Sequence, residues 1–345
     1  MKRITGFVFF LFSVLVANGC TTFFINHNGQ MVFGRNYDWM ADAGMICTNQ
    51  KGLAKTSMKN NDGTTISWIS QFGSITFNQY GKEFPTGGMN EKGLVVELMW
   101  LDGTMYPSPD ERPAIGVLQW IQYQLDNCGT IDEVISTDKK IRIISKGTPL
   151  HYLVADANGN AATIEFLHGK MTVHKSNNLP FPVLTNDTYE SSVAAKQNGY
   201  YNRSNSLERF VQACNMVQQY STIASGKSLI DHSFDILNKV AQGDHTKWSI
   251  VYDISNKKIY FKTQQFQQLK SIEFSSLDFS CTVKPKAMDM NKELSGDIKN
   301  SFADFSIDLN RQITGQAFDQ SKEQIQPTSE EKEAVINYAV KIFCK

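Results

Sequence analysis

The residue with the clearest chemical potential in this chain is Cys20, because of what precedes it. A basic pair at residues 2–3 is followed by an apolar run over residues 7–17 and by small residues up to Gly19. This arrangement is typical of a secretory signal peptide with a small-x-small cleavage site, and the run is too short to span a membrane. Cleavage after Gly19 would leave Cys20 as the first residue, with its thiol beside a free α-amino group. The pattern predicts an exported protein, periplasmic or extracellular, whose N-terminal cysteine attacks an amide carbonyl.

A second interpretation uses the same cysteine. Bacterial lipoproteins also begin at a cysteine after signal removal, and there the thiol is lipidated and the amine acylated. Their cleavage sites usually carry a leucine three residues before the cysteine, where this chain has Ala17, followed by the polar Asn18. The site suits an ordinary signal peptidase better. A lipidated or secreted ligand-binding protein without turnover therefore stays open as the alternative function.

The residues after Cys20 predict a hairpin. Two β-branched and aromatic runs, at residues 21–25 and 30–33, flank the turn Asn28-Gly29, and Asn-Gly is the strongest two-residue hairpin signal. Counting outward from this turn places Cys20 opposite Tyr37. The segment that follows the second run is thus folded back onto the start of the mature chain.

That register brings Arg35 and Asp38 close to the thiol and amine of Cys20. A cationic neighbour such as Arg35 favours the thiolate, which is the reactive form. An α-amino group has an ordinary pKa of about 7.7–8.0, which suits a general base near neutral pH. Asp38 can accept hydrogen bonds from the amine or the thiol and fix their orientation. A surface ion pair would be the ordinary interpretation of Arg35 and Asp38, but a cleavable cysteine opposite them favours a catalytic group.

With these residues in place, the chain resembles the choloylglycine hydrolase family, the linear-amide hydrolases that include bile salt hydrolases and penicillin V acylases. The resemblance runs from Cys20 to about Thr263. Its motifs occur in the family's order: Cys20-Thr21, Gly34-Arg35-Asn36-Tyr37-Asp38-Trp39, Gly88-Met89-Asn90-Glu91-Lys92-Gly93-Leu94, Arg112-Pro113-Ala114 with the helix up to Asn127, Leu184-Thr185-Asn186, Asn202-Arg203-Ser204 through Arg209-Phe210-Val211, and the strand pair from Trp248.

The resemblance implies a fold and a set of roles. The fold is α+β, a four-layer αββα sandwich of two antiparallel sheets between helical layers. Cys20 would be the nucleophile with its own amine as base, supported by Arg35 and Asp38. Asn186 would donate its side-chain amide to the oxyanion, because negative charge develops on the carbonyl oxygen. Arg209 would be the family's second active-site arginine.

Three departures from the family pattern weaken bile salts as the substrate more than they weaken the chemistry. The position that usually holds Asn or Tyr falls on Trp100, so its hydrogen bond is missing or replaced by the indole N–H. The stretch between Asn186 and Arg209 is short, whereas many relatives carry a longer segment that helps to assemble a tetramer in Gram-positive members. The spacing before Arg209 is slightly expanded, so Arg203 is a reserve candidate for the arginine.

The acyl side of the substrate is expected to be apolar. Phe24, Met99, Trp100 and Tyr106 are candidates to line a substrate pocket, although core packing explains them equally well. The expected reaction is hydrolysis of a non-peptide linear C–N amide through a thioester, with no metal or cofactor. Candidate substrates are conjugated bile acids, phenoxyacetyl penicillins and N-acyl amines, and the sequence does not choose among them.

Composition limits the partners. Lysine plus arginine equals aspartate plus glutamate at 34 each, so no long-range field recruits nucleic acid or an acidic membrane. Five cysteines besides Cys20 are scattered, which predicts buried thiols with at most one or two disulfides. The six histidines form no HExxH pair, although a Cys–His protease dyad stays open. The expected partner is a small amide, without nucleic acid or a membrane span, and a homo-oligomer is compatible with the sequence.

Hairpin strands followed by helices favour an antiparallel α+β fold over a doubly wound one. We expect a signal peptide at 1–19, a hydrolase domain at 20–284 and an extension at 285–345 that packs on the core as a strand plus a terminal helix. Helices are predicted at 113–127, 204–220 and 233–242, a loop or linker at 285–300, and a strand at 305–309. A capping-box spacing at Thr328 and Glu331 opens the terminal helix. No function follows for the residues beyond Thr263.

Overall fold

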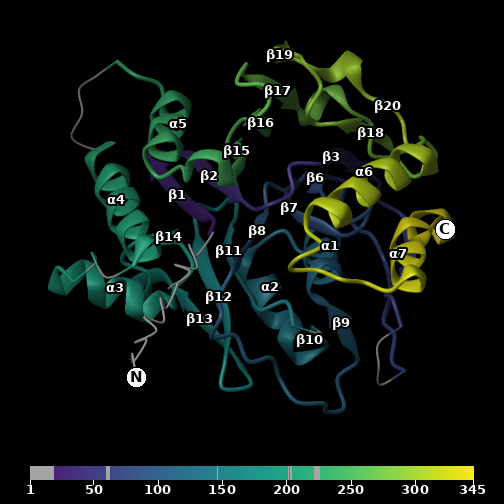
Figure 1. Ribbon diagram of the computed structural model, residues 1–345, viewed down its shortest axis with the longest axis horizontal. Coiled ribbons are helices and arrows are strands. Elements are labelled where there is room, and N and C mark those ends of the chain that lie inside the picture. The colour runs from purple at the N-terminus through teal and green to yellow at the C-terminus, as the bar shows by residue number, and fades with distance from the viewer. Residues whose placement is uncertain (1–18, 60–62, 146, 201, 203, 221–225) are drawn as a thin grey trace, which may run out of the picture.

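Two facing, mainly antiparallel sheets form the centre of the protein (Figure 1). The computed structural model describes residues 19–59, 63–145, 147–200, 202, 204–220 and 226–345. Residues 1–18, which make up nearly all of the predicted signal peptide, and the reserve candidate Arg203 lie outside the described residues. Within the described part, a seven-stranded sheet and a nine-stranded sheet form the two inner layers.

The seven-stranded sheet contains the predicted hairpin. Asn28 and Gly29 form its turn with positive φ angles of 52° and 82°, and Thr21 pairs with Asn36, so the predicted register is confirmed. The strand order is β14 (Val183–Leu184), β1 (Thr21–His27), β2 (Gln30–Asp38), β15 (Thr246–Asp253), β16 (Lys258–Thr263), β17 (Lys270–Glu273) and β19 (Gly296–Asp297).

The nine-stranded sheet is antiparallel throughout. Its order is β13 (Lys170–Lys175), β12 (Ala161–Leu167), β11 (Leu150–Ala155), β8 (Val95–Trp100), β7 (Pro85–Asn90), β6 (Ser74–Asn78), β3 (Met45–Asn49), β18 (Lys286–Asp289) and β20 (Ala303–Asp304). Two small sheets flank it, one of β9 (Ala114–Gly116) and β10 (Arg142–Ile144), the other of β21 (Phe343–Cys344), β4 (Leu53–Thr56) and β5 (Ser67–Ile69).

Aromatic side chains fill the space between the two large sheets. Phe77 of β6 meets Tyr252 of β15 and Phe261 of β16 edge-on, with ring centroids 6.1 and 5.7 Å apart. Such edge-to-face pairs add specific geometry to the burial of large apolar area. A buried ion pair between Arg35 of β2 and Glu97 of β8 crosses the same interface. The sheets are therefore joined at their centre by a charged contact as well as by packing.

Helices cover the outer faces of both sheets. On the seven-stranded side, α4 (Asn205–Gln219) packs on β1 and β14, α5 (Leu229–Lys239) on β2 and β15, and α3 (Tyr189–Asn198) on α4. On the other side, α1 (Val117–Asn127) packs on β7 and β8, and α2 (Ile131–Ser136) follows it. Figure 1 shows α3, α4 and α5 on one side of the molecule and α1 on the other. The expected αββα sandwich is confirmed.

Two of the three predicted helices begin elsewhere than expected. The helix expected at 113–127 starts only at Val117, because residues 114–116 form β9. The helix expected at 233–242 starts at Leu229, where the side chain of Ser228 accepts a hydrogen bond from the Asp231 N–H and caps the first turn. The helix expected at 204–220 is confirmed as α4, with Ser204 as its cap.

Two secondary-structure predictions for the C-terminal part were wrong. The region expected as a loop or linker contains β18, which pairs with β3 in the nine-stranded sheet. The strand expected at 305–309 is the start of helix α6 (Ile307–Gln320), capped by the Ser306 side chain. Alternation over five residues does not distinguish a strand from one helical turn, whereas the buried residues of α6 recur at helical spacing: Asn310, Ile313, Thr314, Ala317 and Phe318.

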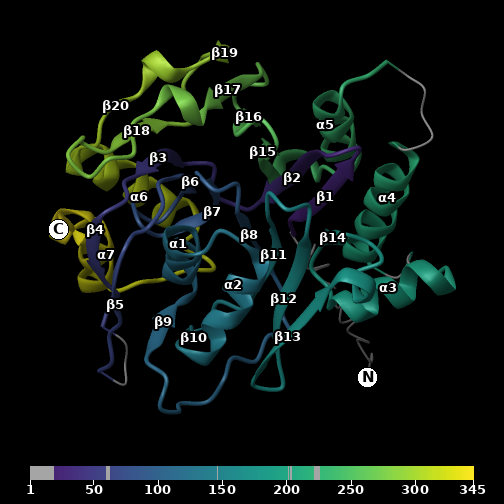
Figure 2. The ribbon, with the colours of Figure 1, turned by 180° about the vertical axis from the view of Figure 1, so that it is seen from behind.

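The chain ends in helix α7 (Ser329–Ile336), a 3₁₀ turn at Tyr338–Lys341 and strand β21. The predicted capping box between Thr328 and Glu331 is present. Figure 2 shows the C-terminus beside β4 and α7. One disulfide joins Cys281 to Cys344, and the other four cysteines are buried and free: Cys20, Cys47, Cys128 and Cys214. None of the helices in the described ranges is both long and apolar enough to span a membrane.

Candidate active site

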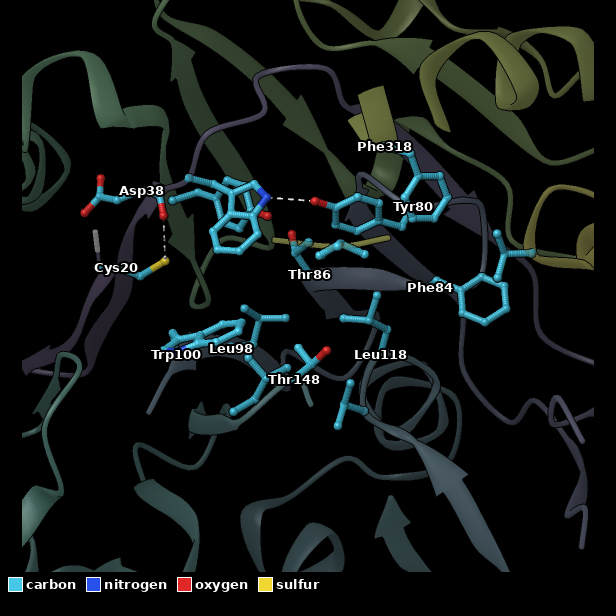
Figure 3. Close-up of a pocket in the computed structure, with 17 residues that line it drawn as sticks. Cys20, Asp38, Tyr80, Phe84, Thr86, Leu98, Trp100, Leu118, Thr148 and Phe318 are labelled. Atoms are coloured by element: carbon cyan, nitrogen blue, oxygen red, sulfur yellow. Dashed lines mark hydrogen bonds between the residues drawn. The ribbon is translucent and has the colours of Figure 1, made fainter. Parts of the chain in front are cut away.

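An apolar pocket of about 210 Å³ opens beside the thiol of Cys20 (Figure 3). Cys20 and Asp38 lie at one end of it, and Phe84 and Phe318 lie toward the other. Thr86 and Thr148 are the remaining polar side chains among the lining residues. The apolar lining consists of Tyr37, Trp39, Tyr80, Phe84, Leu98, Trp100, Val117, Leu118, Leu150, Phe318, Ile325 and Val335.

Cys20 precedes the first residue of β1 and is 4 % exposed. Its Sγ lies 3.9 Å from the backbone carbonyl oxygen of Asp38 and 4.0 Å from Nη2 of Arg35. Burial raises the pKa of the thiol, and the nearby charge of Arg35 lowers it by less. The prediction that Arg35 favours the thiolate is therefore correct in direction, but burial outweighs it. In the chain that retains Gly19, burial therefore favours the neutral thiol.

Arg35 projects from β2 of the seven-stranded sheet and is held by β7 and β8 of the nine-stranded sheet. Its guanidinium donates to the backbone oxygens of Thr86 and Leu98, at 3.1 and 3.2 Å, and pairs with the carboxylate of Glu97. Burial disfavours the charge of Arg35, but the charge of Glu97 raises the pKa of the guanidinium above its ordinary value. Gly87 lies opposite Glu97 in the sheet, and a Cβ there would stand 1.9 Å from Glu97 Oε2. The absent side chain at Gly87 makes room for the carboxylate that holds Arg35.

Asp38 lies at the end of β2, and two residues that the sequence did not single out bind its carboxylate. Nε2 of Gln242 donates to it at 2.9 Å, and the hydroxyl of Thr246 donates at 2.5 Å. The same Gln242 amide donates to the carbonyl of Gly19, the residue before Cys20. Burial raises the pKa of Asp38, partly offset by the charge of Arg209 and by these hydrogen bonds. Through Gln242, Asp38 is linked to the peptide group between Gly19 and Cys20, the bond whose cleavage would free the Cys20 amine.

Arg209 projects from α4 onto the start of β1. Its Nη1 donates to the carbonyl oxygen of Cys20 at 2.7 Å and to the hydroxyl of Thr21 at 2.8 Å. Its Nη2 donates to Oδ1 of Asn186 at 2.9 Å, and its Nε donates to Oδ1 of Asn205 at 2.8 Å. The arginine is 4 % exposed and connects Cys20 to Asn186, the predicted oxyanion donor.

Asn186 lies directly beside the peptide that precedes Cys20. A Cβ placed on Gly19 would stand 1.8 Å from Asn186 Oδ1. Because Arg209 binds the side-chain oxygen, the amide group is fixed with its Nδ2 on the other side, where one N–H donates to the backbone oxygen of Trp100 at 2.8 Å. An amide nitrogen carries two hydrogens, so a second donor remains for a substrate oxygen.

Trp100 lines the pocket, as the sequence suggested. Its indole N–H donates to Oδ1 of Asp102 at 2.6 Å, so it does not replace the hydrogen bond that the family's Asn or Tyr would make. The backbone oxygen of Trp100 binds Asn186 instead. The indole rings of Trp100 and Trp39 lie 5.9 Å apart, and both line the pocket.

The other three side chains suggested for the pocket are not among its lining residues, which corrects that prediction: Phe24 and Met99 are buried in the core, and Tyr106 is half-buried and packs against it. Met99 neighbours Trp100 on β8, and successive residues of a strand point to opposite faces, so only one of the two can face the pocket. Met99 is fully buried and contacts the hydroxyl of Thr22. Phe24 is 4 % exposed inside β1. Tyr106 binds backbone groups at residues 148 and 150 through its hydroxyl.

The buried histidine His151 is not among the residues that line the pocket. Among the described residues that line the pocket there is no histidine. His151 is buried between the backbone oxygen of Thr185 and the carboxylate of Glu165, at 2.7 and 3.2 Å. In the described part of the chain, no three His, Cys, Asp or Glu side chains lie together as a metal site.

Comparison with models of protein families gives a match for this chain. Residues 20–205 match the model of the linear amide C–N hydrolases of the choloylglycine hydrolase family, which is more than half of the chain. The chain belongs to this family. The resemblance drawn from the sequence motifs is therefore confirmed, and the matched region includes Cys20, Arg35, Asp38 and Asn186 but not Arg209.

Individual relatives point in the same direction. A penicillin V acylase from Pectobacterium atrosepticum is 27% identical over 231 residues, which cover 57% of this chain and 59% of that protein, less than two thirds of its length. The solved penicillin V acylase from Agrobacterium tumefaciens has a TM-score of 0.73 at 24% identity and covers 83% of this chain and 98% of its own. A mutant conjugated bile acid hydrolase from Clostridium perfringens has a TM-score of 0.66 at 20% identity, covering 80% and 98%. Both structures share the fold of this chain.

Proposed function

We propose that this protein is an exported cysteine hydrolase that cleaves a linear amide C–N bond through a thioester on Cys20. The observation that carries the proposal is the position of the Cys20 thiol at the polar end of an otherwise apolar pocket. An acyl group that enters the apolar part places its carbonyl carbon at the sulfur, which is how such pockets orient ligands. Export rests on the signal-peptide pattern of residues 1–19.

The first half of the reaction forms the thioester. The α-amine of Cys20, free after cleavage of the bond to Gly19, takes the thiol proton as the sulfur attacks the carbonyl carbon. Negative charge develops on the carbonyl oxygen, and the second Nδ2 hydrogen of Asn186 donates to it. The C–N bond then breaks, and the proton passes from the α-amine to the leaving amine. Arg35 offsets the negative charge that the sulfur acquires before the bond to carbon forms.

The second half restores the enzyme. Water attacks the thioester carbonyl, the α-amine takes a proton from that water, and the same oxyanion contact stabilises the tetrahedral intermediate. The C–S bond breaks, the proton returns to the sulfur, and the carboxylic acid leaves. Arg209 acts by positioning, since it holds both the Cys20 carbonyl and the Asn186 side chain.

Two substrate classes come from the relatives, penicillin V and conjugated bile acids. N-acyl amines are a third class with the same bond. The first experiment is amide hydrolysis by protein that begins at Cys20, followed by mass spectrometry with penicillin V, glycocholate, taurocholate and a long-chain N-acyl homoserine lactone. We expect turnover of at least one amide.

The matched control is Cys20→Ser, with circular dichroism to show that it folds. We expect the substitution to abolish turnover. Turnover that persists in Cys20→Ser would contradict the proposal. Silence from folded protein whose N-terminal Cys20 is confirmed by mass would favour the alternative, a ligand-binding protein on the same fold.

A further inference from the structure

The far wall of the pocket comes from the C-terminal part of the chain, for which the sequence indicated no function. Phe318 of α6, Ile325 of the loop that follows and Val335 of α7 all line the cavity whose other end holds Cys20. Figure 3 shows Phe318 beside Tyr80, away from Cys20. We call Phe318, Ile325 and Val335 the C-terminal wall.

Contacts on α6 hold the first part of this wall against the pocket. The ring of Phe318 packs on Tyr80 with centroids 4.9 Å apart. The Tyr80 hydroxyl accepts a hydrogen bond from the indole N–H of Trp39 at 2.7 Å and donates to the hydroxyl of Ser321 at 2.9 Å. A continuous set of contacts thus runs from α6 to Trp39 at the catalytic end of the pocket.

The second part of the wall is also fixed. Asn310 of α6 donates to the backbone oxygen of Ile336 in α7 at 2.8 Å, which joins the two helices. Tyr338, just after α7, donates to the backbone of β4 at 2.8 Å and meets the ring of Phe84 at 5.2 Å. The disulfide to Cys281 holds the chain end at Cys344. These contacts hold the C-terminal wall in place at the end of the cavity.

We propose that the C-terminal wall sets the acyl specificity of the hydrolase. The proposal rests on the proposed amide hydrolysis and adds a substrate class to it. The cavity of about 210 Å³ lies below the roughly 300–1,000 Å³ of pockets for drug-sized ligands. The wall carries only carbon side chains, so a charged acyl end would lose its water without compensation. The pocket therefore accepts a single aromatic ring or an unbranched alkyl chain and excludes fused-ring acyl groups.

The test keeps the leaving amine constant and varies only the acyl group. N-acylglycines with alkyl chains of increasing length, phenoxyacetylglycine and glycocholate are compared by kcat/KM with protein that begins at Cys20. We expect the aryl and alkyl substrates to exceed glycocholate by at least about tenfold, because poor fit in an apolar pocket costs about ten- to 200-fold for each methylene-sized difference.

Substitutions in the C-terminal wall should change which alkyl chain length of the acyl group is preferred. Ile325→Ala and Val335→Ala lengthen the cavity, so the ratio of kcat/KM for the longest to the shortest chain should rise about tenfold, and Ile325→Phe should lower it. Ile325 and Val335 are only half-buried, which makes folded variants accessible. Val340→Ala is the matched control, since Val340 follows α7, is 62 % exposed and is not among the residues that line the pocket.

Two results would overturn the inference while the hydrolase proposal stands. The first is that glycocholate is hydrolysed as fast as the alkyl substrates. The second is that all three wall variants keep their Tm and show the same dependence of kcat/KM on chain length as the unchanged protein. If no amide is hydrolysed, the hydrolase proposal fails instead. The wall is then tested by tryptophan fluorescence during titration with the free carboxylic acids. If the longest carboxylic acid that binds changes in the Ile325 variants, the result supports the role of the C-terminal wall in specificity. If that chain length stays the same, the result contradicts it.

Discussion

At Cys20, burial and charge act on the thiol in opposite directions. Burial raises its pKa and the charge of Arg35 lowers it by less, so burial favours the neutral thiol in the chain that retains Gly19. In the proposed mechanism, the α-amine that cleavage after Gly19 would free is the base that takes the thiol proton. Arg35 would then stabilise the thiolate as it forms.

The raised pKa of the Cys20 thiol predicts its reactivity with pH. In protein that retains Gly19, and so has no free amine at Cys20, alkylation by iodoacetamide should show a midpoint above the ordinary thiol pKa of about 8.5. A raised pKa means less thiolate at any lower pH, so the rate at neutral pH should be below that of an exposed cysteine. Mass spectrometry of the alkylated peptide gives the rate, and a midpoint below 8.5 would show that Arg35 outweighs burial.

Variants of the buried Arg35–Glu97 pair allow the effect of Arg35 on stability to be measured apart from its effect on hydrolysis. Arg35→Met leaves the Glu97 carboxylate buried without its cation, which should cost about 3–5 kcal/mol in the free energy of unfolding. Arg35→Met/Glu97→Gln removes both charges and should recover much of that loss without recovering hydrolysis. Urea unfolding and amide turnover measure the two quantities. A double variant with full activity would show that Arg35 has only a structural role.

Local sequence signals are sufficient to predict the first hairpin but not helix α6. Asn28-Gly29 determines the turn and therefore the register of β1 against β2, which brings Arg35 and Asp38 to Cys20. The residues at 305–309 carry an alternation that suits a strand or one helical turn, and only the later residues Ile313, Ala317 and Phe318 show the helical spacing. Short patterns thus predict an element well where a specific turn limits the choices.

The disulfide between Cys281 and Cys344 should stabilise the C-terminal elements. It joins residues 63 positions apart, and closing a loop of that length limits the unfolded chain by roughly 4 kcal/mol at most. Cys281→Ser/Cys344→Ser should therefore lower the free energy of unfolding by up to this amount, as measured with urea. The matched control is the wild type in dithiothreitol, which should show the same loss. Equal stability of oxidised and reduced protein, with the thiol count confirmed by mass, would contradict the prediction.

For the molecule as a whole, the sequence predicts the family, the αββα sandwich and the residues grouped near the start of the mature chain. It does not predict Gln242 and Thr246 on Asp38, because a register shift between Thr246 and Trp248 decides how β15 meets β2. It also misses most of the pocket. Phe318, Ile325 and Val335 reach Cys20's cavity only through the packing of α6 and α7, which no local pattern encodes.

If Cys20 acts with its own α-amine, hydrolysis depends on whether the chain begins at Cys20. Two proteins are prepared that differ by one residue, one beginning at Cys20 and one at Gly19, and their hydrolysis of the best amide is measured while mass spectrometry confirms each N-terminus. We expect the protein beginning at Gly19 to be slower by about 10²–10⁴-fold, the contribution of a positioned general base. Equal rates from the two intact proteins would contradict it.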